Sequence, residues 1–221
     1  MLSLPFSQRD TFPPLKGKWY NTKRKPGAHL YCISVSLPGT VKREVRRRMD
    51  GRLGVISDTH GHEEAWRKAL SRWGEIEGVL HCGDVLAEIA TGLEEMIRDA
   101  PFPVIISRGN CDRPEDEALI GWPILAPYAT VWWHSRLILV GHGAPFQPLK
   151  ELGLRCRADL VIYGHTHVGS LVREEGTIFL NPGSAALPKG RDPASAAVLD
   201  GDGIRIFVLE NGKTLHHEPW I

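Results

Sequence analysis

Residue types that bind metal ions recur in this sequence at the ends of short apolar segments. Five segments rich in Val, Ile and Leu each run into a carboxylate, an amide or an imidazole. The side chains that share this position are Asp58, His60, Asp84, Asn110, His142, His165 and His167. These groups supply oxygen and nitrogen donors for divalent cations. Their recurrence predicts one metal centre assembled from five separate parts of the chain.

The spacing of these residues supports a shared site. In an extended segment, residues two apart project to the same side. The pair Asp58 and His60 can therefore bind one ion together, and so can the pair His165 and His167. Glycine directly precedes four of the side chains, where it lets the backbone turn and leaves space for an ion and a substrate. Taken singly, each motif is equally typical of a turn, a helix cap or an exposed strand. The repetition at five segment ends favours the metal site.

The apolar segments predict buried strands, and helices separate the first of them. The segments are 53–57, 79–83, 104–109, 137–141 and 160–164. Trp66, Leu70 and Trp73 recur at helical spacing. A second helix is predicted after Asp84, ended by Pro101, with one apolar face formed by Leu86, Ile89, Ala90, Leu93 and Ile97. Two strand–helix units before the third strand favour parallel pairing, which brings carboxyl ends to one edge of the sheet.

The second half of the chain predicts hairpins. Turns at 134–135, 174–176 and 200–203 separate β-rich runs, and one helix is predicted within Phe146–Cys156. Trp132 and Trp133 place one ring on each face of a strand, one in the core and one exposed at a surface for self-association into a homo-oligomer. The prediction is an α/β fold (α+β by some schemes) with two mixed sheets packed face to face and helices outside.

Composition excludes several classes of protein. The chain has 221 residues, 42% hydrophobic and 24% charged, which suits one domain with a buried core. No apolar stretch reaches the roughly 18–20 residues that span a bilayer, and residues 1–15 hold no signal-peptide core. Four scattered cysteines do not suggest a disulfide framework. We expect a cytoplasmic protein that is not bound to a membrane.

Charge divides the chain near residue 48. Residues 1–48 hold eleven Lys or Arg against two acidic residues, a net +9, which leaves 16 basic and 24 acidic residues, a net −8, for the remainder. We expect a disordered or loosely attached extension at 1–48, a core domain at 49–215 and a tail at 216–221. The alternatives for 1–48 are sequence upstream of a true start at Met49, a transit peptide, or an arm that binds nucleic acid.

The ordered motifs Asp58-x-His60, Gly83-Asp84, Gly109-Asn110, Gly141-His142 and Gly164-His165-Thr166-His167 resemble the signature of calcineurin-like metallophosphoesterases. The resemblance covers Leu53 to about Leu187. The segments 108–112 and 181–184 are similar to those of the small YfcE-like phosphodiesterases, a branch related in fold to the retromer scaffold subunit. The resemblance implies a four-layer α/β/β/α sandwich of two mixed sheets flanked by helices.

The resemblance also implies a ligand set and a mechanism. Asp58, His60 and His167 would hold one metal, and Asn110, His142 and His165 the other, with Asp84 bridging both. A hydroxide bridging the metals beside Asp84 would attack phosphorus in line. The nitrogen and oxygen donors suit two divalent ions, Mn2+ favoured, with Fe, Zn or Ni as alternatives and Mg less suited to the imidazoles.

The sequence departs from the wider family at two places, and both departures restrict the expected class of substrate. Cys111 stands where many members have a His, and a thiol is a poorer proton donor, so we expect substrates with good leaving groups or help from Asp112. The residues after Asp84 lack the Asp-Arg-Gly of protein phosphatases, which disfavours phosphoproteins. Arg108 is a candidate phosphate contact, and Asn181 a support for the site.

The expected function is hydrolysis of a small phosphodiester by a metal-dependent phosphodiesterase. A non-catalytic metal-binding scaffold of the same fold is one alternative, although loss of ligands would then be expected. A nuclease or nucleotide phosphodiesterase aided by the basic extension is another.

Overall fold

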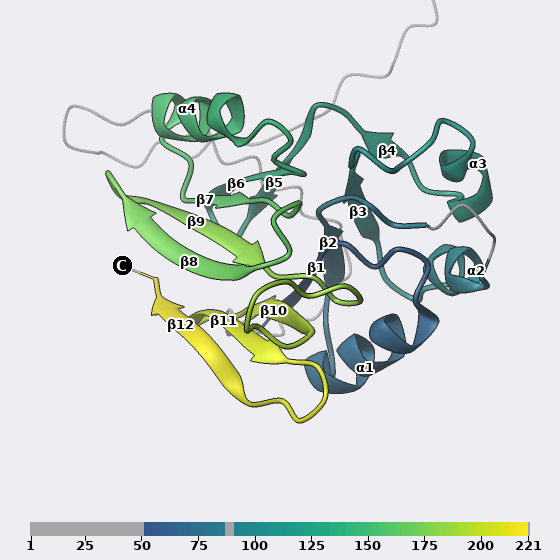
Figure 1. The fold of residues 1–221 in the computed structure, drawn as a ribbon. Helices are drawn as coiled ribbons and strands as arrows, with labels where there is room; N and C mark the ends of the chain where they lie inside the picture. Colours follow the sequence, from purple (N-terminus) through teal and green to yellow (C-terminus); the bar gives the residue numbers. More distant parts are fainter. Residues whose placement is uncertain (1–50, 87–90, 221) are drawn as a thin grey trace, which may run out of the picture. The chain divides into compact units, whose positions relative to one another are not determined.

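Two mixed β-sheets hold the strands that carry the predicted ligands in this computed structural model (Figure 1). The structure describes residues 51–86 and 91–220. The larger sheet consists, in spatial order, of β12 (Thr214–Pro219), β11 (Gly203–Val208), β10 (Ser195–Leu199), β1 (Leu53–Ile56), β2 (Gly78–His81), β3 (Val104–Ser107) and β4 (Ile124–Leu125). The smaller sheet consists of β5 (Tyr128–Trp133), β6 (Arg136–Gly141), β7 (Leu160–Ile162), β9 (Thr177–Pro182) and β8 (Gly169–Glu174).

Parallel pairing occupies the part of each sheet that leads to the predicted site. Strands β1, β2, β3 and β4 run parallel to their neighbours in this series, as do β6, β7 and β9. The three predicted hairpins are β5–β6, β8–β9 and β10–β11, each antiparallel. The prediction of two mixed sheets is confirmed.

Helices cover the outer faces of the two sheets. They are α1 (Glu63–Trp73), α2 (Leu93–Arg98), α3 (Asp116–Ile120) and α4 (Phe146–Cys156). Buried side chains of α1, α2 and α3 pack with the larger sheet, and Leu149 of α4 packs with Val161 and Phe179 of the smaller one. The four layers thus follow the order helix, sheet, sheet, helix.

A separate apolar core fills the space between the sheets. Val55 and Leu80 of the larger sheet share it with Val140 and Leu160 of the smaller sheet. Alternation along β1 explains how one strand serves two cores, because Val55 faces the other sheet while Ile56 faces the helices. Burial of both faces accounts for the continuous apolar runs in the sequence.

Two predicted boundaries were wrong. Within the described residues, the helix expected from about Leu86 begins at Leu93, directly after Gly92, which adopts φ +93°. Residues 87–90, which include Ile89 and Ala90, lie outside the described residues. The segment 216–219, assigned to a tail, belongs to β12 and pairs with β11. The prediction for residues 1–48 also falls outside the described part.

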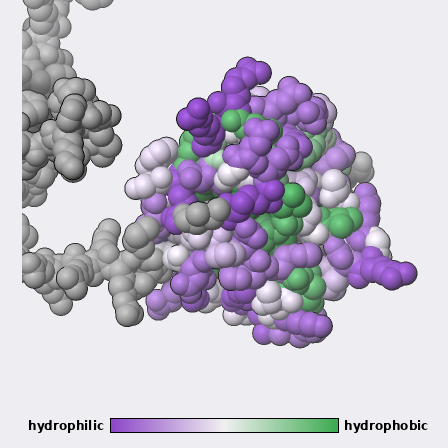
Figure 2. All heavy atoms as spheres, turned by 90° about the vertical axis from the view of Figure 1, so that its left-hand side faces the viewer, coloured by the Kyte–Doolittle hydropathy of each residue, from purple (hydrophilic) through white to green (hydrophobic). Residues whose placement is uncertain are grey.

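The surface in the view of Figure 2 is mainly hydrophilic, with hydrophobic side chains in limited areas. Trp132 is 71% exposed and Trp133 is 8% exposed, as expected for neighbours on opposite faces of a strand. Self-association through the exposed ring stays a prediction. Among the described residues, no helix has both the length and the apolar character needed to cross a membrane.

Candidate metal centre

The seven predicted ligands follow strands of both sheets. Asp58 and His60 come after β1, Asp84 after β2 and Asn110 after β3, all in the larger sheet. The smaller sheet supplies His142 after β6, and His165 and His167 after β7. Because these strands end at the edge where the sheets meet, residues more than one hundred positions apart become neighbours.

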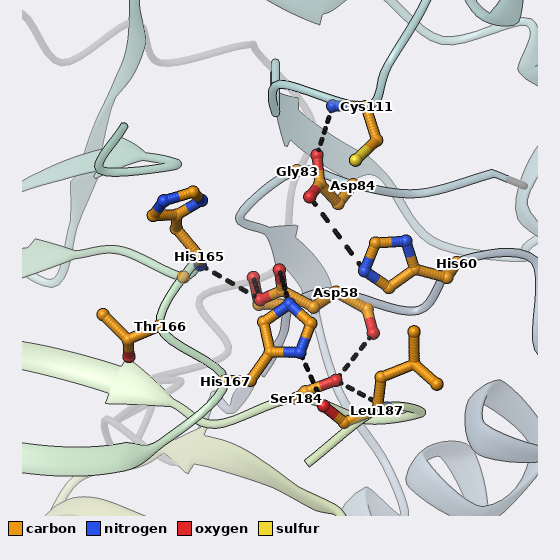
Figure 3. Close-up of polar contacts among 12 residues, drawn as sticks. Asp58, His60, Gly83, Asp84, Cys111, His165, Thr166, His167, Ser184 and Leu187 are labelled. Atoms are coloured by element: carbon orange, nitrogen blue, oxygen red, sulfur yellow. Dashed lines mark hydrogen bonds and ion pairs between the residues drawn. The ribbon is translucent and has the colours of Figure 1, made fainter. Parts of the chain in front are cut away.

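Asp58, His60 and His167 form the first group of donors. One ligand atom from each lies within 4.8 Å of the others, and His167 Nε2 is 3.2 Å from Asp58 Oδ1 (Figure 3). Asp58 Oδ1 and His60 Nε2 are buried without a hydrogen-bond partner among the described residues. Buried polar atoms without partners are costly. A cation would satisfy both atoms, so these residues fit the metal that the ligand pattern implies.

Asn110 is the centre of the second group. Its Oδ1 lies 3.0 Å from His142 Nε2 and 2.9 Å from His165 Nδ1. Asp84 Oδ2 lies 3.4 Å from His142 Nε2 and 4.0 Å from His60 Nε2. Asp84 therefore stands between the two groups, as a bridging ligand must.

Backbone carbonyls orient two of the imidazoles. His142 Nδ1 lies 2.7 Å from the carbonyl oxygen of Cys82, and His167 Nδ1 lies 2.5 Å from that of Leu187 (Figure 3). A proton on Nδ1 makes these hydrogen bonds and leaves the Nε2 lone pair directed at the site. The surrounding loops thus set the tautomer that a metal ligand needs.

The backbone is strained at five of the seven predicted ligands. The φ angles are positive, between 43° and 65°, at Asp58, His60, Asp84, His165 and His167. Side-chain-bearing residues avoid this left-handed region, and exceptions concentrate at functional sites. The sharp turns aim side chains inward directly after each strand.

Two glycines permit the close approach of the loops. A Cβ atom at Gly109 would overlap the Asp84 carboxylate, and one at Gly164 would overlap the Ser57 hydroxyl. Ser57 in turn donates a 2.6 Å hydrogen bond to Asp58 Oδ2. The glycines before Asn110 and His165 are therefore required by packing around the carboxylates.

The charges of the centre favour a cation. Burial opposes ionisation of Asp84, yet the neighbouring His142 imidazole and a hydrogen bond from the backbone N–H of Cys111 hold the pKa of this carboxyl well below its ordinary value. Burial, partly offset by Asp84 and Asp58, lowers the pKa of His60. A carboxylate beside a neutral imidazole is the protonation state that binds a metal.

Asp112 binds the backbone of the loops that carry Asp84 and Asn110. Its carboxylate accepts hydrogen bonds from the backbone N–H groups of Gly109, Asp84 and Val85 at 2.7–2.9 Å. All three bonds hold the loops after β2 and β3, and the residue is buried. Asp112 thus holds these loops in position, and its help in protonating a leaving group stays a prediction.

Asn181 supports the loop after β7. Its amide nitrogen donates to the carbonyl oxygen of Gly164 at 2.8 Å and to Thr166 Oγ1 at 3.0 Å, and its Oδ1 accepts from the Gly183 N–H. It contacts Gly164 and Thr166, the two neighbours of His165, rather than an imidazole. The expected support therefore acts through the backbone.

Arg108 and Cys111 lie on the open side of the centre. Arg108 donates a 3.5 Å hydrogen bond to the Asp112 carbonyl oxygen and lies 3.8 Å from Glu117. Burial and the neighbouring Asp84 raise the pKa of the Cys111 thiol to about 11. The thiol is thus protonated at neutral pH, and Asn110 and His165 are the exposed ligands beside it.

Sequence reasoning missed the contribution of Thr59 and His81. Thr59 Oγ1 lies 2.9 Å from His81 Nε2 and donates to the Val85 carbonyl oxygen at 2.8 Å. Burial lowers the pKa of His81 to about 3, so its imidazole is neutral. This pair joins the loops after β1 and β2 beneath the ligands. The sequence feature that could have identified Thr59 is its position inside the Asp58-x-His60 motif.

Comparison with known proteins agrees with this geometry. The calcineurin-like phosphoesterase superfamily domain matches residues 52–203. Phosphodiesterase YfcE of Escherichia coli K12 is 31% identical over 173 residues, which are 72% of this chain and 93% of YfcE. A probable metallophosphoesterase of Methanothermobacter thermautotrophicus is 30% identical over 171 residues, 72% of this chain and 92% of that protein.

Solved structures share the fold. The E. coli Yfce phosphoesterase superposes with a TM-score of 0.67 at 27% identity, covering 77% of this chain and all of Yfce. Vacuolar Protein Sorting 29 of Cryptosporidium parvum has a TM-score of 0.59 at 23% identity, covering 78% of this chain and all of that one. This chain therefore belongs to the calcineurin-like phosphoesterase superfamily, in its YfcE-like branch, and is a hydrolase of phosphoric ester bonds.

Proposed function

We propose that this protein is a phosphodiesterase that works with two divalent cations. The observation that carries the proposal is the convergence of seven nitrogen and oxygen donors from both sheets, with Asp58 Oδ1 and His60 Nε2 buried and unpaired among the described residues. Asp58, His60 and His167 would hold one cation, Asn110, His142 and His165 the other, and Asp84 would contact both.

The cations would offset the negative charge of the phosphate and make hydroxide available near neutral pH. The protein's own residues provide the rest. The two carbonyl contacts orient His142 and His167, and Asp112 holds the loops of Asp84 and Asn110 in place. Arg108 brings a permanent positive charge close to Asn110, where it would bind a phosphoryl oxygen.

A preference for substrates with good leaving groups is supported by the thiol beside Asn110. The protonated Cys111 thiol is a weak acid and a poor proton donor to a leaving oxygen. Esters whose leaving groups need no proton are then favoured. The relatives named phosphodiesterases, YfcE and an archaeal protein of Methanocaldococcus jannaschii, support diesters as the substrate class. Manganese as the native cation and a cytoplasmic location complete the proposal.

The test is hydrolysis by protein that has been stripped with a chelator and resupplied with Mn2+. We expect a higher kcat/KM for bis(p-nitrophenyl) phosphate than for p-nitrophenyl phosphate. Asp84→Asn and Asn110→Ala should each lower kcat by about 100-fold or more, since each alters a proposed ligand of the cations that would stabilise charge at the reacting group. Asp99→Asn, an exposed change outside the site, should leave kcat unaltered.

Two results would contradict the proposal. Absence of hydrolysis of either ester by metal-replete protein would overturn the phosphoesterase activity of the centre. A higher kcat/KM for the monoester would overturn the preference for diesters and leave the metal centre intact.

A further inference from the structure

A pocket of about 330 Å³ adjoins the second group of donors. Asn110 and His142 line one end of it. Its lining residues come from three segments: the loop after β3, the connection from β4 into β5, and the loop from β6 into α4. Its volume lies at the lower end of the range for small-molecule sites, about 300–1,000 Å³. A group that enters the pocket must therefore be small and lie close to the metal centre.

Apolar residues make up most of the pocket lining. Tyr128, Pro127, Pro145 and Pro148 contribute rings, and Tyr128 is 37% exposed although it is a large aromatic side chain. Ring faces pack most effectively against another planar ring, and an aromatic pair gains stabilisation beyond the area that it buries. The surface of this wall therefore favours an aromatic group.

The charges of the lining restrict the ligand further. Arg108 is the charged side chain that lines the pocket, and no carboxylate is among the described lining residues. A cationic group would meet Arg108 in the lining, because Glu117, 3.8 Å from Arg108, is not among the lining residues. A second anion would compete with the phosphate for Arg108. These charges favour an uncharged ring, with Arg108 free to contact a phosphate held next to Asn110.

We propose that this pocket binds an uncharged aromatic ring carried by one ester group of the substrate, with Tyr128 packing against the ring. The substrate class is thus an aryl or arylmethyl phosphodiester, in which the ring lies within a few bonds of phosphorus. This inference rests on the proposed phosphodiesterase function, because it takes Asn110 and His142 to lie beside the phosphate.

Three phosphonates test the pocket without turnover. Phenylphosphonate, cyclohexylphosphonate and methylphosphonate carry the same anionic group and differ in the attached group. Their dissociation constants are measured by calorimetry on the full chain with Mn2+. We expect phenylphosphonate to bind about five- to tenfold more tightly than methylphosphonate, the gain of one aromatic contact, with cyclohexylphosphonate in between.

Variants of two aromatic residues in β5 test whether Tyr128 causes the preference for phenylphosphonate. Tyr128→Ala should bring the ratio of the methyl to the phenyl dissociation constant close to one, and Tyr128→Phe should keep it. Trp132→Ala is the matched control, because Trp132 is an exposed aromatic residue of the same strand outside the pocket lining. Thermal unfolding of each variant checks that the fold is retained, and the comparison of the three ligands on unaltered protein needs no variant.

The outcomes separate this inference from the proposed function. Equal binding of the phenyl and methyl compounds would overturn the proposed ring site, and so would an unchanged ratio of their dissociation constants in Tyr128→Ala. If the same sample hydrolyses the diester, the proposed function is unaffected by that result. Equal binding of phenyl and cyclohexyl compounds overturns the aromatic preference. A preserved phenyl preference without any hydrolysis overturns the function and supports the pocket.

Discussion

Individual residues in this protein act mainly by holding loops that bear other residues. Asp112 illustrates this, because its carboxylate accepts three backbone hydrogen bonds from the loops of Asp84 and Asn110. Hydrogen bonds to a charged acceptor are stronger than those between neutral groups. The positions of Asp84 and Asn110 therefore depend on the buried side chain of Asp112.

Replacement of this carboxylate should destabilise the protein. Asp112→Asn keeps the shape but sets an amide N–H against a backbone N–H, so we expect the free energy of unfolding to fall by about 2–4 kcal/mol. Urea denaturation measures this change. Asp99→Asn, on an exposed helix end, should change it by less than about 0.5 kcal/mol. Equal effects of the two changes would contradict the positioning role.

At the scale of elements, the strands deliver the ligands and α1 fixes the central strand. Trp73 of α1 donates a 2.7 Å hydrogen bond from Nε1 to the carbonyl oxygen of Ala197 in β10. A Cβ atom at Gly54 in β1 would lie 2.7 Å from the Trp73 ring. The indole thus packs directly on β1, the strand that leads to Asp58.

Loss of this indole contact should be measurable. Trp73→Phe removes the N–H donor and part of the ring, so the free energy of unfolding should fall by about 2–3 kcal/mol. Trp132→Phe makes the same chemical change at a site that is 71% exposed, and should have little effect. Guanidinium denaturation of both variants tests the difference. Similar midpoints would show that α1 does not secure the sheet through Trp73.

At the scale of the whole described unit, the candidate centre joins the two sheets. Asp58, Asp84 and Asn110 belong to loops of the larger sheet, while His142 and His167 belong to loops of the smaller one. A cation held by residues of both sheets would bind the folded state and not the unfolded chain. Its binding energy would then add to the stability of the sandwich.

Cation binding should raise the melting temperature. At a free Mn2+ concentration 100 times the dissociation constant the gain is about 2.7 kcal/mol, which corresponds to a rise of about 5–10 °C for a protein of this size. Calorimetry with Mn2+ and with a chelator measures the rise. Asp58→Asn and His142→Ala should each reduce it, whereas His216→Ala on β12 should not. An identical melting temperature with and without Mn2+, Zn2+ and Fe2+ would contradict the centre.

Local sequence determined which elements form and which residues stand at their ends. Apolar runs and turn residues set the strands and hairpins, and α4 has the bounds Phe146–Cys156 within which it was predicted. The seven donors could be named for the same reason, since each lies within three residues of the end of such a run. The start of α2 and the strand β12 were missed, because the first depends on the conformation of Gly92 and the second on pairing with β11.

Tertiary structure alone decided how the donors meet and what surrounds them. The contact of Asn110 with both His142 and His165, the binding of three backbone amides by Asp112, and the pocket beside Tyr128 all join segments distant in sequence. Such contacts arise from the pairing of strands within a sheet and from the packing of one sheet on the other, which no local pattern encodes. Residue order thus determined the chemistry available at the strand ends, and the sandwich decided its geometry.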